Sequence, residues 1–255
     1  SNDAITNVLI KANSAFVNVI RYNIHNCSLA VSTKMVDVFI FLSLVVLGDT
    51  LFLIPNAPRS AGKILAVGNG GPWGSWYQPQ YCPIGSYAVG YNMKIQGEQH
   101  DRDDTGLNAI SLRCQPLGVS RDVADITSEE GGWGTWVGWT MCNINLESQR
   151  TFLTSFSLQV EVNQFSGDDT AANFVKFMCR GFNSSFQERE LSYPPGHGPW
   201  GSYGDWSQSC PLNSAICGIQ TKVEPFQGEG GLFGGDDTAL NDVQFICCND
   251  TSNEK

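Results

Sequence analysis

Three Asp-Asp-Thr triplets, which start at Asp103, Asp168 and Asp236, are the most regularly spaced carboxylate pairs of this chain. Paired carboxylates bind cations or act as acid and base in glycoside chemistry, where the two groups stand about 5 Å apart or several ångströms more. Consecutive residues of a strand point to opposite faces, so adjacent Asp residues do not naturally face one substrate. Asp also bonds to its own backbone in turns. We therefore favour a turn role for the triplets.

Acidic residues that the three copies do not share are better candidates for a single site. If the loops before the triplets converge at one end of the domain, their carboxylates line one acidic groove, shift each other's pKa and yield one acid and one base. A separation above about 10 Å would exclude that cooperation. Glu98 and Glu229 are such residues, and the groove would also contain the first Asp of each triplet. The weak catalytic candidates are therefore Glu98, Asp103, Asp168, Glu229 and Asp236.

Aromatic residues recur with the triplets. Such rings either stack on the apolar faces of sugars or fill the interior of the domain, and their strict repetition beside glycine favours the interior. The repeated rings are Trp73, Trp76, Trp133, Trp136, Trp200 and Tyr203. Less regular rings are the better candidates for contact with a ligand. The preferred glycan-binding residues are Trp139, Trp206 and Asp205.

The elements that must position these residues form one unit written three times. Gly-Pro-Trp-Gly or Gly-Gly-Trp-Gly starts each copy at Gly71, Gly131 and Gly198, and a cysteine, the triplet, an Asn and a second cysteine follow. Alternating apolar residues, as in 152–162, and frequent glycine indicate short strands without long helices. One copy cannot bury its apolar face alone. We therefore predict an all-β fold in which each copy supplies about one antiparallel sheet and three sheets pack around a pseudo-threefold axis.

The chain divides into three expected parts. Residues 1–34 precede Met35, the first methionine, and are expected to be upstream sequence without a structural role. Residues 35–61 contain an apolar run of signal-peptide length. Residues 62–255 form a single domain with repeats at about 68–119, 128–181 and 195–249. A membrane anchor is the alternative for the apolar run, although Asp49 interrupts it.

Nine cysteines predict a disulfide framework. Eight lie inside the repeats, at spacings that do not suit zinc or redox motifs. Pairing within each repeat, with the remaining two joined by elimination, gives Cys82–Cys114, Cys142–Cys179, Cys210–Cys247 and Cys217–Cys248. A switch between the neighbours Cys247 and Cys248 is the alternative.

Charge and composition narrow the partners. The net charge is −10 and no cluster of Lys and Arg exists, which argues against nucleic acid and anionic membranes as partners. No metal or cofactor is expected. Glycosylation sequons at Asn183 and Asn249 fit a secreted, extracellular protein that does not contact the membrane once its signal peptide is removed.

Several motifs together resemble the vitelline membrane outer layer proteins. They are the Gly-Pro-Trp-Gly starts, Gln-Gly-Glu at 96–98 and 227–229, and Gly-Asp-Asp-Thr-Ala-Leu-Asn at 235–241. The resemblance covers nearly all of residues 68–249, cysteines included. It implies a secreted β-prism, related to sugar-binding prism lectins, and in the avian member a lysozyme-like transfer of N-acetylchito-oligosaccharides. The second copy departs from the pattern, with Glu161-Val-Asn163 in place of Gln-Gly-Glu, which argues against a strictly threefold site.

Two functions are consistent with these patterns. The first is a secreted, disulfide-stabilised β-prism of an egg coat or a secreted fluid that binds glycans or extracellular coat proteins. The second is a weak lysozyme-like glycosyl transferase acting on N-acetylchito-oligosaccharides. We favour the first, because no carboxylate pair looks like a dedicated acid and nucleophile.

Overall fold

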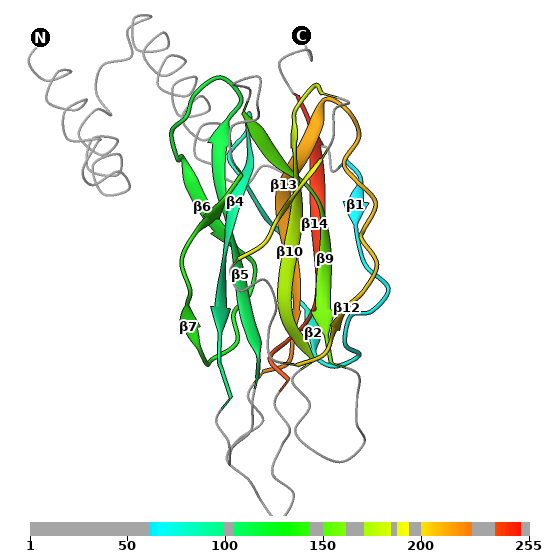
Figure 1. The fold of residues 1–255 in the computed structure, drawn as a ribbon. Helices are drawn as coiled ribbons and strands as arrows, with labels where there is room; N and C mark the ends of the chain where they lie inside the picture. The colour runs from blue at the N-terminus through cyan, green and yellow to red at the C-terminus, as the bar shows by residue number, and fades with distance from the viewer. Residues whose placement is uncertain are drawn as a thin grey trace, which may run out of the picture. The chain divides into compact units, whose positions relative to one another are not determined.

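A computed structural model describes residues 62–98, 105–142, 150–161, 171–184, 188–193, 200–225 and 238–250. All regular structure in these residues is β-strand, and six strands of ten residues form three antiparallel hairpins (Figure 1). The long strands are β4 (Ser86–Ile95) with β5 (Leu107–Pro116), β9 (Thr151–Val160) with β10 (Ala172–Gly181), and β13 (Ser214–Val223) with β14 (Leu240–Asn249). The predicted all-β prism of three antiparallel sheets is confirmed.

Short strands flank each long hairpin. Sheet A has the order β1-β14-β13-β2 with β3 also on β13, sheet B the order β6-β5-β4-β7 with β8 also on β4, and sheet C the order β11-β10-β9-β12. The short strands are β1 (Ile64–Leu65), β2 (Ser75–Trp76), β3 (Gln80–Tyr81), β6 (Ala124–Thr127), β7 (Thr135–Trp136), β8 (Thr140–Met141), β11 (Arg189–Leu191) and β12 (Ser202–Tyr203). They pair with hairpin edges that would otherwise expose unbonded backbone groups.

The prediction that each copy supplies its own sheet is wrong in one respect. The short strands of a copy join the long hairpin of the preceding copy: β7 pairs with β4, and β12 pairs with β9. The first copy has no predecessor, so β2 pairs with β13 of the last copy and β1 pairs with β14. The three copies are thus linked as a closed ring.

Aromatic side chains fill the core between the sheets. In the larger cluster Phe245 of sheet A packs edge-on against Phe156 and Phe177 of sheet C, with ring centroids 4.8 and 5.1 Å apart, and the ring of Tyr91 of sheet B lies 4.7 Å from that of Phe177. A second cluster centres on Tyr87, whose ring lies 4.7 Å from that of Phe182. Both clusters join residues of all three sheets, and burial of such rings is the main stabilising term for small sheets.

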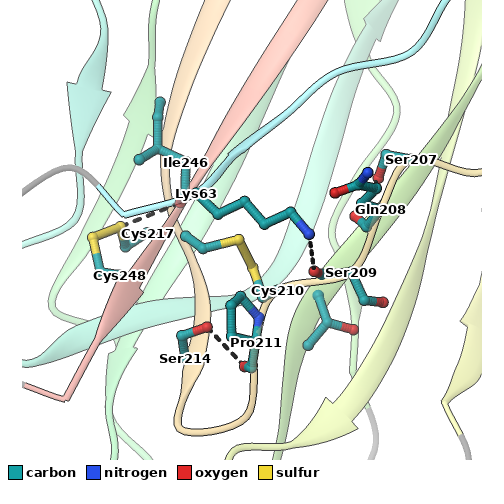
Figure 2. The surroundings of a disulfide bond; sticks show 12 residues. Lys63, Ser207, Gln208, Ser209, Cys210, Pro211, Ser214, Cys217, Ile246 and Cys248 are labelled. Carbon is teal, nitrogen blue, oxygen red and sulfur yellow. Dashed lines mark hydrogen bonds between the residues drawn. A yellow bond between two sulfur atoms is a disulfide. The ribbon is translucent and has the colours of Figure 1, made fainter.

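Disulfides connect the sheets. The four pairs are Cys82–Cys114, Cys142–Cys179, Cys210–Cys247 and Cys217–Cys248, the pairing expected from the sequence. In the first three, one cysteine follows the short strands on one sheet and its partner lies in a long strand of the next, so the bridges run around the prism. Cys217–Cys248 joins the two long strands of sheet A. Figure 2 shows it near Cys210 and Lys63, whose Nζ donates to the backbone oxygen of Ser209 at 3.3 Å.

The expected upstream segment 1–34 and signal peptide 35–61 lie outside the described residues. In the part of the chain that the structure describes, no helix has the length and apolar character needed to span a membrane. Asn183 and Asn249 are both exposed, and their glycosylation stays a prediction.

Candidate functional site

In each long hairpin a loop joins the two strands, and the three loops leave from the same end of the prism (Figure 1). We call the points where the two strands of a hairpin meet its loop the hairpin mouths. At each mouth one backbone bond joins the two strands: Gln96 N to Gly106 O at 2.9 Å, Glu161 N to Ala171 O at 2.8 Å, and Glu224 N to Ala239 O at 2.8 Å. Gly106, Ala171 and Ala239 have φ of 59°, 50° and 49°. This left-handed conformation is uncommon for alanine and marks the same sharp turn in every copy.

A buried polar network fixes the first and third mouths. In the first copy Thr105 Oγ1 donates to Gln96 Oε1 at 2.7 Å, and Asn108 Nδ2 donates to Thr105 Oγ1 at 2.6 Å. In the third copy Thr238 Oγ1 donates to Glu224 Oε2 and Asn241 Nδ2 donates to Thr238 Oγ1, both at 2.6 Å. The Thr of the triplet and the following Asn are therefore structural, which supports the turn role.

The mouths contact one another around the axis. A β-carbon added to Gly71 would lie 3.2 Å from Cβ of Ala171, and one added to Gly131 would lie 2.9 Å from Cβ of Ala239. A β-carbon on Gly106 would lie 2.7 Å from Oδ1 of Asn173. The bases of the three loops therefore lie together at one end of the prism.

Among the catalytic candidates, only Glu98 is described, and it is exposed. Asp103, Asp168, Glu229 and Asp236 lie outside the described residues, so their cooperation stays a prediction. The sequence analysis did not make Glu161 or Glu224 a site candidate, although each directly follows a long strand, as Gln96 does. One carboxylate oxygen of Glu224 accepts the hydrogen bond from Thr238 described above, so Glu224 helps to hold the third mouth.

The repeated Trp residues are the second feature of this end. The expectation that they fill the interior is wrong for four of them: Trp73, Trp76, Trp133 and Trp136 are 46, 39, 45 and 40% exposed. The interior is instead filled by Tyr and Phe from the long strands. We call Trp73 with Trp76, on sheet A, and Trp133 with Trp136, on sheet B, the bare Trp pairs, a name that refers only to their solvent exposure.

The backbone under the bare Trp pairs is firmly held. Gly71 N donates to Asn241 O and Gly131 N donates to Asn108 O, both at 2.7 Å. On sheet A, Lys222 Nζ donates to Pro72 O at 2.7 Å and to Gly71 O at 3.2 Å. On sheet B, Lys94 Nζ donates to Gly131 O at 3.0 Å. Each pair is therefore anchored to a central strand of its sheet.

Glycine between the two rings allows a close approach to the sheet. Gly74 and Gly134 have φ of 75° and 79°. A β-carbon at either position would overlap the backbone of Val223 or Ile95. The side chains are thus exposed on a backbone that packs closely against the sheet.

The equivalent rings of sheet C have a different environment. Trp200 and Tyr203 are partly buried, and Gln159 Nε2 donates to Trp200 O at 2.6 Å. The ammonium of Lys176 lies 4.5 Å from the centre of the Tyr203 ring, and burial raises the pKa of Tyr203 to about 12. One face of the Tyr203 ring is therefore covered by the Lys176 ammonium.

Trp139 and Trp206, the preferred glycan-binding residues, are also partly buried and lie under cations. Arg113 Cζ is 3.9 Å from the centre of the Trp139 ring, and Arg113 is itself held by Asp125 with two bonds of 3.0 Å. Lys176 Nζ is 4.9 Å from the Trp206 ring. Asp205 is exposed. Each of these two indoles therefore has one face occupied, and a role in glycan binding stays a prediction.

Comparison with known sequences places this arrangement in a family. The model of "Vitelline membrane outer layer protein I (VOMI)" matches residues 63–250, which include every described strand. The chain belongs to the VOMI family. A Homo sapiens relative, "Vitelline membrane outer layer protein 1 homolog", is 40% identical over 186 residues, 72% of this chain and 82% of the relative. The relative of the same name in Mus musculus is 37% identical over 210 residues, 82% of this chain and 94% of the relative.

Solved structures similar to this VOMI chain include plant lectins. A mannose-specific jacalin-related lectin from Morus nigra, in complex with mannose, aligns with a TM-score of 0.42 at 13% identity, over 75% of this chain and 97% of the lectin. An artocarpin–mannopentose complex aligns with a TM-score of 0.41 at 12% identity, over 73% of this chain and 98% of the lectin.

Proposed function

We propose that this VOMI-family protein is a secreted, extracellular β-prism that binds glycans through its bare Trp pairs. The observation that carries the proposal is the exposure of Trp73, Trp76, Trp133 and Trp136 on a hydrogen-bonded backbone. Extracellular location is supported by four disulfides, which form and persist in oxidising compartments.

The physical argument concerns what exposed rings do. Large apolar side chains exposed in equivalent pairs mark interaction surfaces more often than isolated ones do. A pyranose ring has an apolar face that stacks on an indole, and an indole presents a broad rigid surface at low entropic cost. Hydrogen bonds hold the backbone of each pair against its sheet. Binding therefore loses less conformational entropy there than it would on a free loop. Extracellular coat proteins are the other class of partner that such a surface suits.

Weak lysozyme-like transfer on N-acetylchito-oligosaccharides is the second candidate function. The observation that favours it is the convergence of the three hairpin mouths, from which the acidic loops leave. It requires two of the loop carboxylates to lie within reach of one glycosidic bond.

Binding to chitin oligosaccharides and to a printed glycan array separates these functions. The double variant Trp73→Ala, Trp133→Ala is expected to lose at least about tenfold in affinity, the effect of removing aromatic contacts from a binding site. The variant Trp139→Ala, Trp206→Ala tests the competing prediction that these two residues bind the glycan. Because both indoles already contact cations, we expect this variant to bind within about twofold of the parent.

Circular dichroism and the thermal midpoint of each variant show whether it is folded. Unchanged binding by a folded Trp73→Ala, Trp133→Ala variant would overturn the proposal. New oligosaccharide lengths that disappear in Glu98→Gln or Glu229→Gln would establish the transferase instead.

A further inference from the structure

The two bare Trp pairs differ in one residue beneath them. Asp242 follows Asn241 on β14, and the position after Asn108 on β5 is Ala109. The corresponding position after Asn173 on β10 is Phe174. Only the copy that supports Trp73 and Trp76 therefore has a titratable group at this point.

Asp242 packs against the segment that leads into the first Trp pair. A β-carbon on Gly70 would overlap the carboxyl group of Asp242, so the Gly70 backbone lies directly over it. Gly71 and Pro72 follow, and their carbonyl oxygens accept from Lys222. Trp73 is the next residue.

The carboxyl group is poorly compensated in this position. Its Oδ1 accepts from Val243 N at 2.8 Å. Lys222 stands opposite it in the β13–β14 register, but the ammonium donates to Gly71 and Pro72 instead. Within the described ranges no Lys or Arg forms an ion pair with Asp242. Burial, opposed in part by the Val243 N–H and by Lys222, raises the pKa of Asp242 to about 6.

Few other charges face this carboxyl group. The segment from Ile64 to Pro72 contains no titratable side chain. Lys63, just before β1, bonds to Ser209. Lys222 on β13 is therefore the charged group that faces Asp242 from the described elements packed against it.

We propose that Asp242 is a positioning residue that couples the Trp73–Trp76 pair to pH: the Gly70–Trp73 segment closes over the protonated carboxyl group and opens when that group ionises. The segment is the part that moves, because Asp242 and Lys222 lie on the two paired central strands of sheet A, whereas residues 66–74 form no strand. Glycan binding at this pair should then be tighter in acid than at neutral pH, a consequence that rests on the function proposed above.

The sign follows from linkage. A carboxyl group with a raised pKa favours the closed state when protonated, so the closed state loses stability as pH rises from about 4 to about 6 and changes little above that. Opening returns the group from a pKa of about 6 to its ordinary 3.8. The opening equilibrium should therefore rise by about twentyfold between about pH 4.5 and about pH 7.

Amide exchange measured by NMR tests this within one molecule. Gly71 N and Gly131 N make equivalent bonds of 2.7 Å. Gly71 lies beside the Asp242 carboxyl group, whereas the carboxylate next to Gly131, that of Glu130, pairs with Lys94 at 3.2 Å. The ratio of their opening constants cancels the intrinsic pH dependence of exchange. We expect this ratio to rise by about twentyfold across that range in the parent protein, and to stay flat and low in Asp242→Asn, which keeps the shape of the neutral carboxyl group.

The outcomes separate the two proposals. A flat ratio in the parent, or the same rise in Asp242→Asn, overturns the role of Asp242. In Asp242→Ala the ratio of opening constants should not rise with pH. The Gly71 amide should nevertheless be less protected from exchange than in Asp242→Asn, because Ala lacks the group over which the segment closes. Failure of chitin oligosaccharides and array glycans to bind would overturn the proposed function, while the exchange ratio would still report on the segment.

Discussion

The bare Trp pairs and the cation-covered aromatics lie on the same prism but present opposite surfaces. Trp73, Trp76, Trp133 and Trp136 repeat strictly and are exposed, whereas Trp139 lies under Arg113, and Lys176 lies between Tyr203 and Trp206. A cation placed over an aromatic ring is attracted to the face of the ring, so that face is already occupied in the absence of a ligand. The difference teaches that repetition reports an equivalent environment, and that this environment can be the surface as well as the core.

Removing the backbone support of a bare Trp pair should have the largest effect. Gly134→Ala places a β-carbon against the backbone of Ile95 at a residue with φ of 79°, and we expect a loss of about 3 kcal/mol in the free energy of unfolding. Gly132→Ala is the control, because nothing lies within 4 Å of its β-carbon. Denaturant unfolding that ranks the two variants equally would show that the pair is not held by this contact.

Uncovering a covered ring should have an intermediate effect. Arg113→Met removes the cation over Trp139 and the bonds to Asp125, and we expect a loss of about 1–2 kcal/mol together with faster solvent exchange of the Trp139 indole N–H. Asp122→Asn removes only the 3.3 Å ion pair to Arg113 and leaves the ring covered. If the indole exchange is the same in both variants, Arg113 does not protect Trp139.

Removing the ammonium beneath a bare Trp pair should have the smallest effect. Lys222→Met and Lys94→Met keep the apolar stem but release backbone oxygens of Pro72 and Gly131, at a cost of about 1 kcal/mol each, or roughly 2–4 °C in the thermal midpoint. The two losses should be similar, because Lys222 bonds to two carbonyl oxygens and Lys94 bonds to one carbonyl oxygen and to the Glu130 carboxylate. Calorimetry that finds both midpoints unchanged would contradict an anchoring role.

Much of the scaffold could be predicted from the sequence. The cysteines at equivalent repeat positions implied one bridge per copy, and alternation in residues such as Phe156 and Leu158 indicated strands with one face in the core. The exchange of short strands between copies could not be predicted. Pairing between Trp76 and Lys222 is a matter of backbone hydrogen bonds, which leave no mark in local sequence.

Less of the candidate site could be predicted. Trp133 is exposed because Tyr91, Phe156 and Phe177 fill the core, and a sequence motif does not show which aromatic residues are buried. The setting of Asp242 depends on Gly70, which is distant in the sequence and becomes a neighbour only when the ring of copies closes. Repeat alignment would have singled out Asp242 as unmatched, but not as half-buried.

Closure of the ring has a consequence for synthesis of the chain. Lys222, which anchors Pro72, lies 150 residues further along. At about 5–20 residues per second the ribosome needs roughly 8–30 s to supply it. The Trp73–Trp76 segment is thus among the first parts of the described domain to be made and among the last to find its partner, so its indoles stay unpaired with their sheet throughout that time.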